Sequence, residues 1–267
     1  MGTWLKELSE LVLPAAASCP LCGSRRRPGR SGWVCCICQK EIDYWEEKYA
    51  QCDVCGRFIS PEGPCLRCSE QLPPFARAVA VGPYRGILKD SLYNLKFRGD
   101  RKIAEPLGKL MVQKIRQQMK LGEIRAVIPV PLHTDRMKTR GFNQAELLAR
   151  EVGKGISRPV LQNVLVKNIE TSSQTHLSQK QREANLSGVF SVSGGGRRLE
   201  GQGVLLIDDI LTTGSTAAEC TRVLLQAGAK KVYVGTVATG IQFFPINHPH
   251  PEGLYHVYSQ VYPHYPQ

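Results

Sequence analysis

The sequence predicts an α/β fold, a mainly parallel twisted sheet flanked by helices, with a small zinc-binding module at the N-terminus. Eight of the ten cysteines lie in four CxxC pairs within the first 68 residues. After Pro73 and Pro74, apolar strand-like runs alternate with amphipathic helical stretches. This alternation is typical of a parallel sheet with helices on its faces.

Length and composition set the expected organisation of the chain. With 267 residues, 42% of them hydrophobic, the protein can form one mid-sized domain and a smaller module. We expect a cysteine-rich double zinc-knuckle module over residues 1–72, an α/β domain over 73–240 and a flexible tail over 241–267. No apolar run approaches the roughly 20 residues of a membrane-spanning helix, so we expect no membrane insertion. Because no export signal is evident, we expect a cytoplasmic protein.

The N-terminal cysteines indicate metal binding rather than a disulfide framework. The four pairs are Cys19/Cys22, Cys35/Cys38, Cys52/Cys55 and Cys65/Cys68. Two CxxC turns supply the four thiolates of a tetrahedral zinc site, so the sequence predicts two zinc ions. The segments CPLCG…CCIC and CDVCG…CLRC repeat the same pattern, which favours pairing in sequence order, although interleaved or nested pairing stays open.

The role of the module has two interpretations. Zinc can supply the folding free energy that a segment of about 70 residues with few large apolar side chains lacks. Alternatively, the module is a nucleic-acid-binding ribbon that uses the arginines between residues 25 and 30. The structural role is favoured, because zinc held by four thiolates carries a formal charge of about −2 and makes the module acidic.

The excess positive charge lies outside the module. The net charge is +12; residues 1–72 contain nine Lys or Arg and nine Asp or Glu, whereas residues 73–267 contain 26 and 14. This excess fits either a solvated basic surface or a surface that binds single-stranded nucleic acid.

Several strands and helices of the second region are evident from their apolar patterns. Residues 78–81 and 126–130 form buried strands, and helical faces run through 104–115 and 145–152. Val204 to Ile207 form another buried strand, followed by a helical stripe from Ala217 to Ala227 that ends at Gly228. The segment VLLIDDILTTGST, residues 204–216, therefore connects the carboxyl end of a strand to the amino end of a helix.

This connection is the position at which α/β sheets hold phosphorylated ligands. Gly214 allows backbone amides to close around a phosphate, and hydroxyls come from Thr212, Thr213, Ser215 and Thr216. Asp208 and Asp209 would repel a bare phosphate, so their partners should be neutral hydroxyls or a bridging magnesium ion. A ribose 5-phosphate meets this requirement, whereas the absence of a Walker lysine disfavours ordinary ATPase chemistry.

The sequence resembles the ComF proteins, competence-associated members of the type I phosphoribosyltransferase superfamily. VLLIDDILTTGST is similar to the superfamily's motif for phosphoribosyl pyrophosphate (PRPP), which implies that Asp208 and Asp209 bind the ribose hydroxyls and Thr212 to Thr216 the 5′-phosphate. The narrower resemblance rests on PVPLHTDRMKTRGFNQ (129–144), LKFRGD (95–100) and QTHLSQKQREAN (174–185), together with the CxxC pairs. It implies a phosphoribosyltransferase-like domain over 73–240 and a role in DNA uptake.

The chemistry that the resemblance implies fits further residues. Pyrophosphate leaves the anomeric carbon with magnesium neutralising its charge, and Arg136, Lys138 and Arg140 are placed in sequence to bind it. Positioning and electrostatics would do most of the work, so Asp208, Asp209, Arg136 and Arg140 are the predicted catalytic set. A solvated basic loop is the alternative for the arginines. Gln174, Arg182 and Asn185 form either a hood over the acceptor or a plain surface loop.

Three functions remain open from the sequence. The protein is an enzyme that transfers a phosphoribosyl group from PRPP to an unknown acceptor, a factor that binds incoming single-stranded DNA, or a zinc-stapled adaptor without turnover. The favoured prediction is a PRPP-binding, transferase-type protein that acts in DNA uptake or utilisation, with other competence proteins as candidate partners.

Overall fold

A computed structural model describes residues 18–59, 65–169, 188–193 and 199–242. The helices are α2 (Cys36–Lys48), α3 (Leu66–Glu70), α4 (Gly86–Phe97), α5 (Ala104–Gln118), α6 (Thr134–Arg140), α7 (Gln144–Ile156) and α9 (Ser215–Gln226), with 3₁₀ turns η1 (Arg101–Ile103) and η2 (Leu121–Glu123). The strands are β1 (Ala50–Gln51), β2 (Phe58–Ile59), β3 (Arg77–Pro83), β4 (Ala126–Pro129), β5 (Leu165–Lys167), β6 (Phe190–Val192), β7 (Gly203–Leu211), β8 (Lys231–Thr239) and β9 (Ile241–Gln242).

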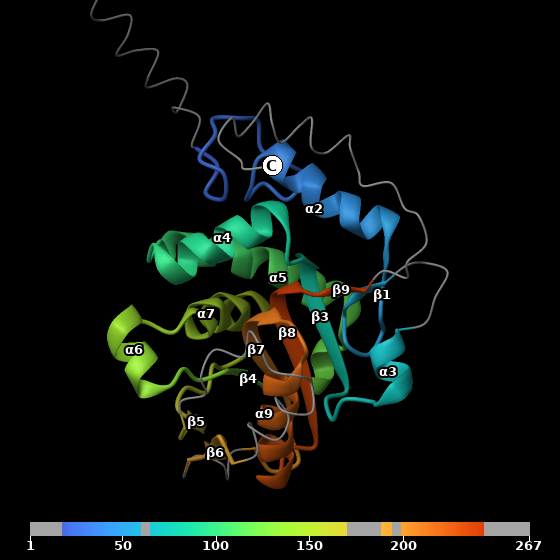
Figure 1. The fold of residues 1–267 in the computed structure, drawn as a ribbon, viewed down its shortest axis with the longest axis vertical. Helices are drawn as coiled ribbons and strands as arrows, with labels where there is room; N and C mark the ends of the chain where they lie inside the picture. The colour runs from blue at the N-terminus through green and yellow to red at the C-terminus, as the bar shows by residue number, and fades with distance from the viewer. Residues whose placement is uncertain (1–17, 60–64, 170–187, 194–198, 243–267) are drawn as a thin grey trace, which may run out of the picture.

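A four-stranded parallel sheet in the order β3-β8-β7-β4 forms the centre of the molecule. Helices α5 and α7 pack against one face of the sheet, and α9 packs against the other (Figure 1). These layers confirm the predicted α/β class. The predicted strands correspond to β3, β4 and β7, and the predicted helical faces belong to α5, α7 and α9.

Along each central strand, successive side chains alternate between two apolar clusters, because neighbouring side chains of a strand point to opposite faces of the sheet. In β7, Leu205 and Ile207 belong to the apolar cluster under α5 and α7. Val204 and Leu206 belong to the cluster under α9. All four side chains are fully buried, which fixes the register of the strand and the direction of the residues that follow it.

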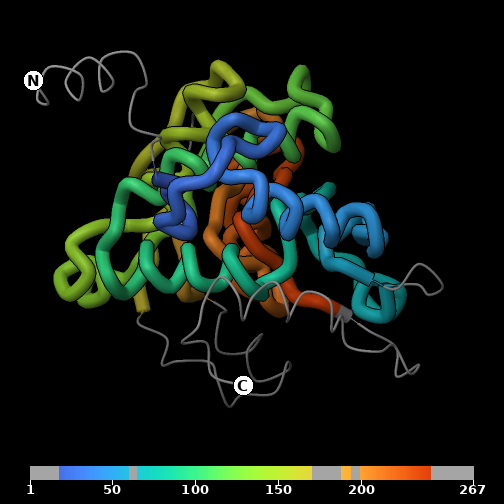
Figure 2. The backbone as a smooth tube through the Cα atoms, turned by 90° about the horizontal axis from the view of Figure 1, so that it is seen from above, coloured from blue at the N-terminus to red at the C-terminus, as the bar shows by residue number. Residues whose placement is uncertain are grey.

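The cysteine-rich segment packs on both sides of this sheet. The first cysteine group shares the apolar cluster of α4 and α5, and Figure 2 shows the blue N-terminal segment lying over these helices. The second group shares the cluster under α9. A small sheet in the order β1-β2-β9 joins the segment to the chain just after β8, so regular structure continues through Gln242.

Within the described ranges, none of the helices has both the length and the apolar character needed to cross a bilayer. The tail beyond residue 242 and the segment 170–187, with Gln174, Arg182 and Asn185, lie outside the described residues.

Candidate functional site

The loop between β7 and α9 forms a cradle at the carboxyl end of the sheet. Gly214 has φ +79°, a left-handed conformation that glycine adopts without strain, and it is the N-cap of α9. It has no side chain to cap the first amides of α9. The hydroxyls of Thr213 and Ser215 lie 3.0 Å apart, and the Ser215 amide lies 3.4 Å from Thr213 Oγ1. A helix amino end that begins at a glycine and has hydroxyls around it is suited to an anion such as a phosphate.

Asp209 is buried and bound by two side chains from other elements. Lys96 Nζ at the end of α4 lies 2.6 Å from Asp209 Oδ2. Gln144 Nε2 at the start of α7 donates to the same oxygen at 3.0 Å. Because this carboxylate is 4% exposed, the two donors offset much of the cost of burying its charge. Asp209 is thus held as an oriented carboxylate.

Asp208 has a different environment. Its Oδ1 accepts the backbone amide of Asp209 at 2.8 Å. Burial, followed by the negative charge of Asp209, raises the pKa of the Asp208 carboxyl to about 8. The raised pKa favours the protonated form of Asp208, whereas Asp209 is paired with Lys96. The repulsion that two adjacent carboxylates would exert on a phosphate is much reduced.

The basic segment after β4 forms helix α6, which ends at Gly141 with φ +75°. Arg140 donates to Gln144 Oε1 at 2.7 Å, so Arg140, Gln144 and Asp209 form a continuous hydrogen-bonded row. Burial lowers the pKa of the Arg140 guanidinium, the charge of Asp209 acts against this, and Arg136 lowers it further. Arg136 lies four residues from Arg140 on the same face of α6, close enough for its charge to act on the Arg140 guanidinium.

Lys138 and His133 take other positions. The Lys138 side chain is 82% exposed, and its ammonium lies 4.0 Å from Asp135. His133 is the N-cap of α6, where Nδ1 accepts the amide of Asp135 at 3.3 Å. The structure therefore links Arg140 to Asp209 through Gln144, places Arg136 beside Arg140, and leaves the Lys138 side chain exposed.

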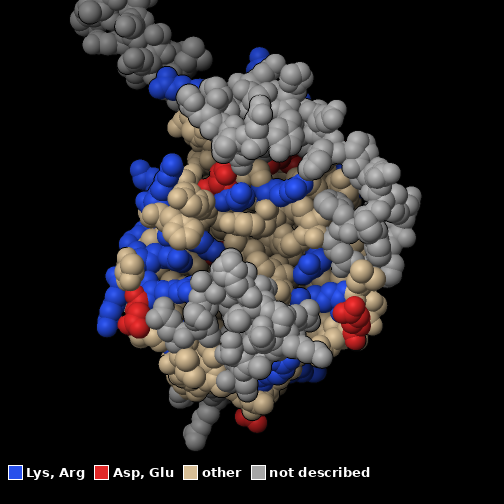
Figure 3. All heavy atoms as spheres, viewed as in Figure 1, with Lys and Arg blue, Asp and Glu red and all other residues tan. Residues whose placement is uncertain are grey.

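Two exposed aromatic side chains lie beside this row. Tyr93 and Phe97 of α4 are 51% and 67% exposed, with ring centroids 5.0 Å apart. The Arg140 guanidinium carbon lies 5.8 Å from the centroid of the Phe97 ring. On the face drawn in Figure 3, Lys and Arg side chains lie above, to the left and to the right of a hollow lined by other residues. Aromatic rings next to arginines suit the binding of a planar base.

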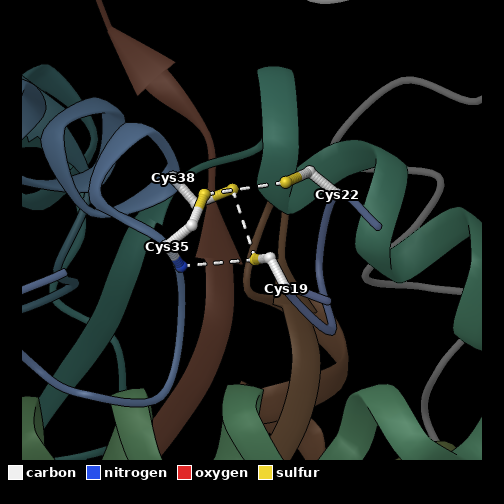
Figure 4. Close-up of side chains that lie close together, drawn as sticks. All are labelled: Cys19, Cys22, Cys35 and Cys38. Carbon is white, nitrogen blue, oxygen red and sulfur yellow. Dashed lines mark hydrogen bonds between the residues drawn. The ribbon is translucent and has the colours of Figure 1, made fainter. Parts of the chain in front are cut away.

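The eight CxxC cysteines gather into two groups in sequence order, as the internal repeat predicted. Within each group all sulfur atoms lie within 4.8 Å of one another. Cys22 and Cys35 Sγ are 3.7 Å apart, and Cys55 and Cys65 Sγ are 3.6 Å apart. Zn–S bonds of about 2.3 Å in a tetrahedron require sulfurs about 3.8 Å apart, so both groups fit zinc. Figure 4 shows the four thiols of the first group converging from two chain segments.

Three residues of the site were not predicted. Lys96 lies within LKFRGD and Gln144 ends the PVPLH segment, but nothing in either segment assigns a partner to them. Arg57 donates to the Thr212 carbonyl at 2.7 Å across 155 positions of the chain. No local sequence pattern could have indicated this contact.

Comparison with known proteins agrees with this fold. The model of the phosphoribosyl transferase domain matches residues 104–244. Competence protein F of Haemophilus influenzae is 32% identical over 211 residues, which cover 77% of this chain and 90% of that protein. The DNA utilization protein YhgH of Salmonella typhimurium is 31% identical over 220 residues, covering 80% of this chain and 94% of that protein. Competence protein ComFC of Bacillus subtilis is 28% identical over 184 residues, covering 66% and 72%. The chain therefore belongs to the phosphoribosyl transferase domain family and, within it, to the ComF proteins.

Proposed function

We propose that the protein binds PRPP together with magnesium at the β7–α9 loop and transfers its phosphoribosyl group to an acceptor, in the uptake or utilisation of incoming DNA. One observation carries the proposal: a single edge of the sheet combines a helix amino end that begins at a glycine, an oriented carboxylate and two neighbouring arginines. These groups match the phosphate, the ribose hydroxyls and the pyrophosphate of one ligand.

Each part of the site has a separate task. The amides and hydroxyls around Gly214 bind the 5′-phosphate. Asp209, fixed by Lys96 and Gln144, accepts a ribose hydroxyl, and Asp208 binds the neighbouring one. Arg136 and Arg140 bind the pyrophosphate and stabilise the charge that it gains as its bond to the anomeric carbon breaks. The protein supplies position and electrostatics, and no dedicated protein base is required.

The donor set of the site supports a magnesium site beside Asp208. Magnesium prefers oxygen ligands and keeps several waters while it binds one or two carboxylates and substrate phosphates. Because Asp209 already binds Lys96 and Gln144, Asp208 is the carboxylate best able to join such a shell, with the ion displacing the proton that its raised pKa favours. When bound, the ion neutralises pyrophosphate charge.

The biological setting rests on the relatives. Proteins named for competence and for DNA utilisation match along most of this chain. We extend that setting to this protein and place its work in the cytoplasm, where reduced thiols remain available to bind zinc. Zinc in both cysteine groups then stabilises the folded N-terminal segment.

Single-stranded DNA binding is the second candidate function. The exposed pair Tyr93 and Phe97, with Arg140 against Phe97, favours it. Successive bases stack on such rings, and basic side chains bind the backbone. Base stacking and PRPP binding are compatible, because the rings lie beside the proposed PRPP site and outside the phosphate loop.

Equilibrium binding of PRPP, with and without magnesium, tests the first proposal. We expect binding that strengthens with magnesium. Release of pyrophosphate on adding candidate nucleobases would then show turnover. If the folded protein does not bind PRPP, the transferase proposal is wrong and the zinc-stapled adaptor is the better account.

A further inference from the structure

The second cysteine group is connected to the phosphate loop by Arg57. This residue follows the CxxC turn of Cys52 and Cys55, and its guanidinium donates to the Thr212 carbonyl at 2.7 Å. A peptide unit is planar and trans, so a carbonyl held toward Arg57 directs the amide of Thr213 the opposite way. One hydrogen bond from the cysteine-rich segment thereby fixes the orientation of an amide in the loop.

The backbone of the CxxC turn fixes Arg57 in turn. The Cys52 amide donates to the Arg57 carbonyl at 2.9 Å, and the Gly56 amide donates to the Cys52 carbonyl at 2.9 Å. Gly56 has φ +65°, and a Cβ there would lie 2.7 Å from the Ala78 carbonyl oxygen of β3. The turn therefore packs tightly against the central sheet, and the position of Arg57 depends on the turn that presents the thiols.

The guanidinium also lies against the end of β8. A Cβ on Gly240 would lie 3.3 Å from a terminal nitrogen of Arg57. The Gly240 amide lies 3.2 Å from the Leu211 carbonyl, at the start of the phosphate loop. Directly after Arg57, β2 pairs in parallel with β9. The CxxC turn, the end of β8 and the phosphate loop thus form one connected structure.

A cavity of about 390 Å³ separates the second cysteine group from the loop. Its lining includes Cys55 and Cys68 on one side and residues 212–215 on the other. No cysteine of the first group lines this cavity. Cys19 and Cys22 instead line a separate cavity together with residues of α4 and η1. Of the two metal groups, only the second is therefore placed to influence the loop directly.

We propose that Arg57 is a positioning residue for the phosphate loop, and that metal binding by Cys52, Cys55, Cys65 and Cys68 thereby raises the affinity of the loop for a ribose 5-phosphate group. Metal loss loosens the CxxC turn, releases the Thr212 carbonyl and leaves the Thr213 amide free to rotate. This inference rests on the proposed PRPP site. It assigns to the second zinc a functional effect in addition to stabilising the fold.

The first experiment measures PRPP affinity by calorimetry in Arg57→Ala, Arg57→Lys and wild type, with zinc content and melting temperature measured on each sample. Because losing this charged hydrogen bond frees the Thr212–Thr213 peptide, we expect Arg57→Ala to bind PRPP at least about tenfold more weakly, with zinc content unchanged. Arg57→Lys keeps a charged donor and should recover most of the affinity.

Arg30→Ala is the matched control, because Arg30 is an arginine of the first cysteine segment that pairs with Asp43. It should bind PRPP as wild type does. If wild type binds PRPP and Arg57→Ala binds it equally well, the inference is wrong and the proposed function stands. If wild type does not bind PRPP, both the inference and the proposed function are wrong.

A second measurement needs no substitution. Linkage is reciprocal, so PRPP must raise the affinity for the second zinc by the factor by which that zinc raises PRPP affinity. With a coloured chelator, saturating PRPP should shift the release of one zinc by about tenfold and leave the other unchanged. Equal effects on both ions, or no effect on either, would refute the coupling.

Discussion

Lys96 Nζ lies 2.6 Å from Asp209 Oδ2, in a pair whose side chains are 19% and 6% exposed. The pair joins the end of α4 to β7, and Gln144 connects the same carboxylate to Arg140. Asp209 is therefore both a candidate ribose ligand and the centre of a buried polar network. Its surroundings lead to predictions for stability as well as for binding.

Lys96→Met should destabilise the protein strongly, because it leaves a buried carboxylate without its cation. Breaking a buried pair costs about 3–5 kcal/mol, so we expect urea unfolding to show a free energy of unfolding that is lower by an amount near the lower end of this range. In Lys96→Met/Asp209→Asn the loss should be smaller than in Lys96→Met alone.

Lys109→Met is the control for that experiment. Lys109 pairs with Glu105 across one helical turn, at 39% and 61% exposure. An exposed pair of this kind contributes little to stability, because water screens its charges. Equal losses in Lys96→Met and Lys109→Met would show that the Lys96 pair is a surface contact.

Asp208→Asn should stabilise the protein in a pH-dependent way. The folded-state pKa of Asp208 is raised to about 8, well above the value of about 3.9 in an unfolded chain. Between these two pKa values the folded state binds one proton more than the unfolded state does. Asp208 therefore lowers the stability of the protein as pH rises from about 4 to about 8. The melting temperature of Asp208→Asn should exceed that of wild type by more at pH 9 than at pH 5.

Glu105→Gln provides the comparison for this pH series. A hydrogen bond from Lys109 lowers the pKa of Glu105, so its ionisation does not change between pH 5 and pH 9. Its difference from wild type should stay constant over that range. A constant difference for Asp208→Asn as well would mean that Asp208 is ionised throughout.

Purified protein should contain two zinc ions per chain, because each cysteine group has four converging thiols. Metal analysis of protein made without added zinc measures this directly. Cys35→Ser should reduce the content to about one, whereas Cys36→Ser should leave two, since Cys36 belongs to neither group. A wild-type content near zero would overturn the metal assignment.

Phe97→Ala should weaken binding of single-stranded DNA. Stacking of one base on an aromatic ring contributes about 1–3 kcal/mol, so we expect at least about a fivefold loss in fluorescence titrations. Affinity should fall steeply with salt in both proteins, and the salt slope should not change, because no phosphate contact is lost. Trp33→Ala removes an exposed ring from the first cysteine segment and should bind normally; an equal loss there would remove the special role of Phe97.

The elements predicted from the sequence share a local signal. The run from Val204 to Ile207 and the turn at Gly214 are adjacent in the chain, so apolar pattern and turn chemistry were enough to place the loop. The repeat of CxxC turns likewise predicted the two groups of thiols. β8, a central strand of the sheet, was not predicted, although its residues 232–238 are all buried.

The contacts around the site depend on the order of the strands and on the packing of separate segments. Lys96 reaches Asp209 only because α4 and β7 meet in the fold, and Arg57 reaches Thr212 only because β2 joins β9. A lysine or arginine in the sequence is usually solvated, and no local pattern distinguishes these two. Lys138, predicted for the phosphate site from its neighbours, has an 82% exposed side chain, and its place in the site stays a prediction.

Calorimetric titration of PRPP with magnesium into wild type and into Asp208→Asn/Asp209→Asn tests the central claim most directly. Melting temperature and zinc content first establish that both proteins are folded. Two lost hydrogen bonds to charged or strongly polar groups should weaken binding by at least about tenfold. We predict saturable binding by wild type and this loss in the double variant; equal affinity in the two folded proteins would contradict the assignment of the site.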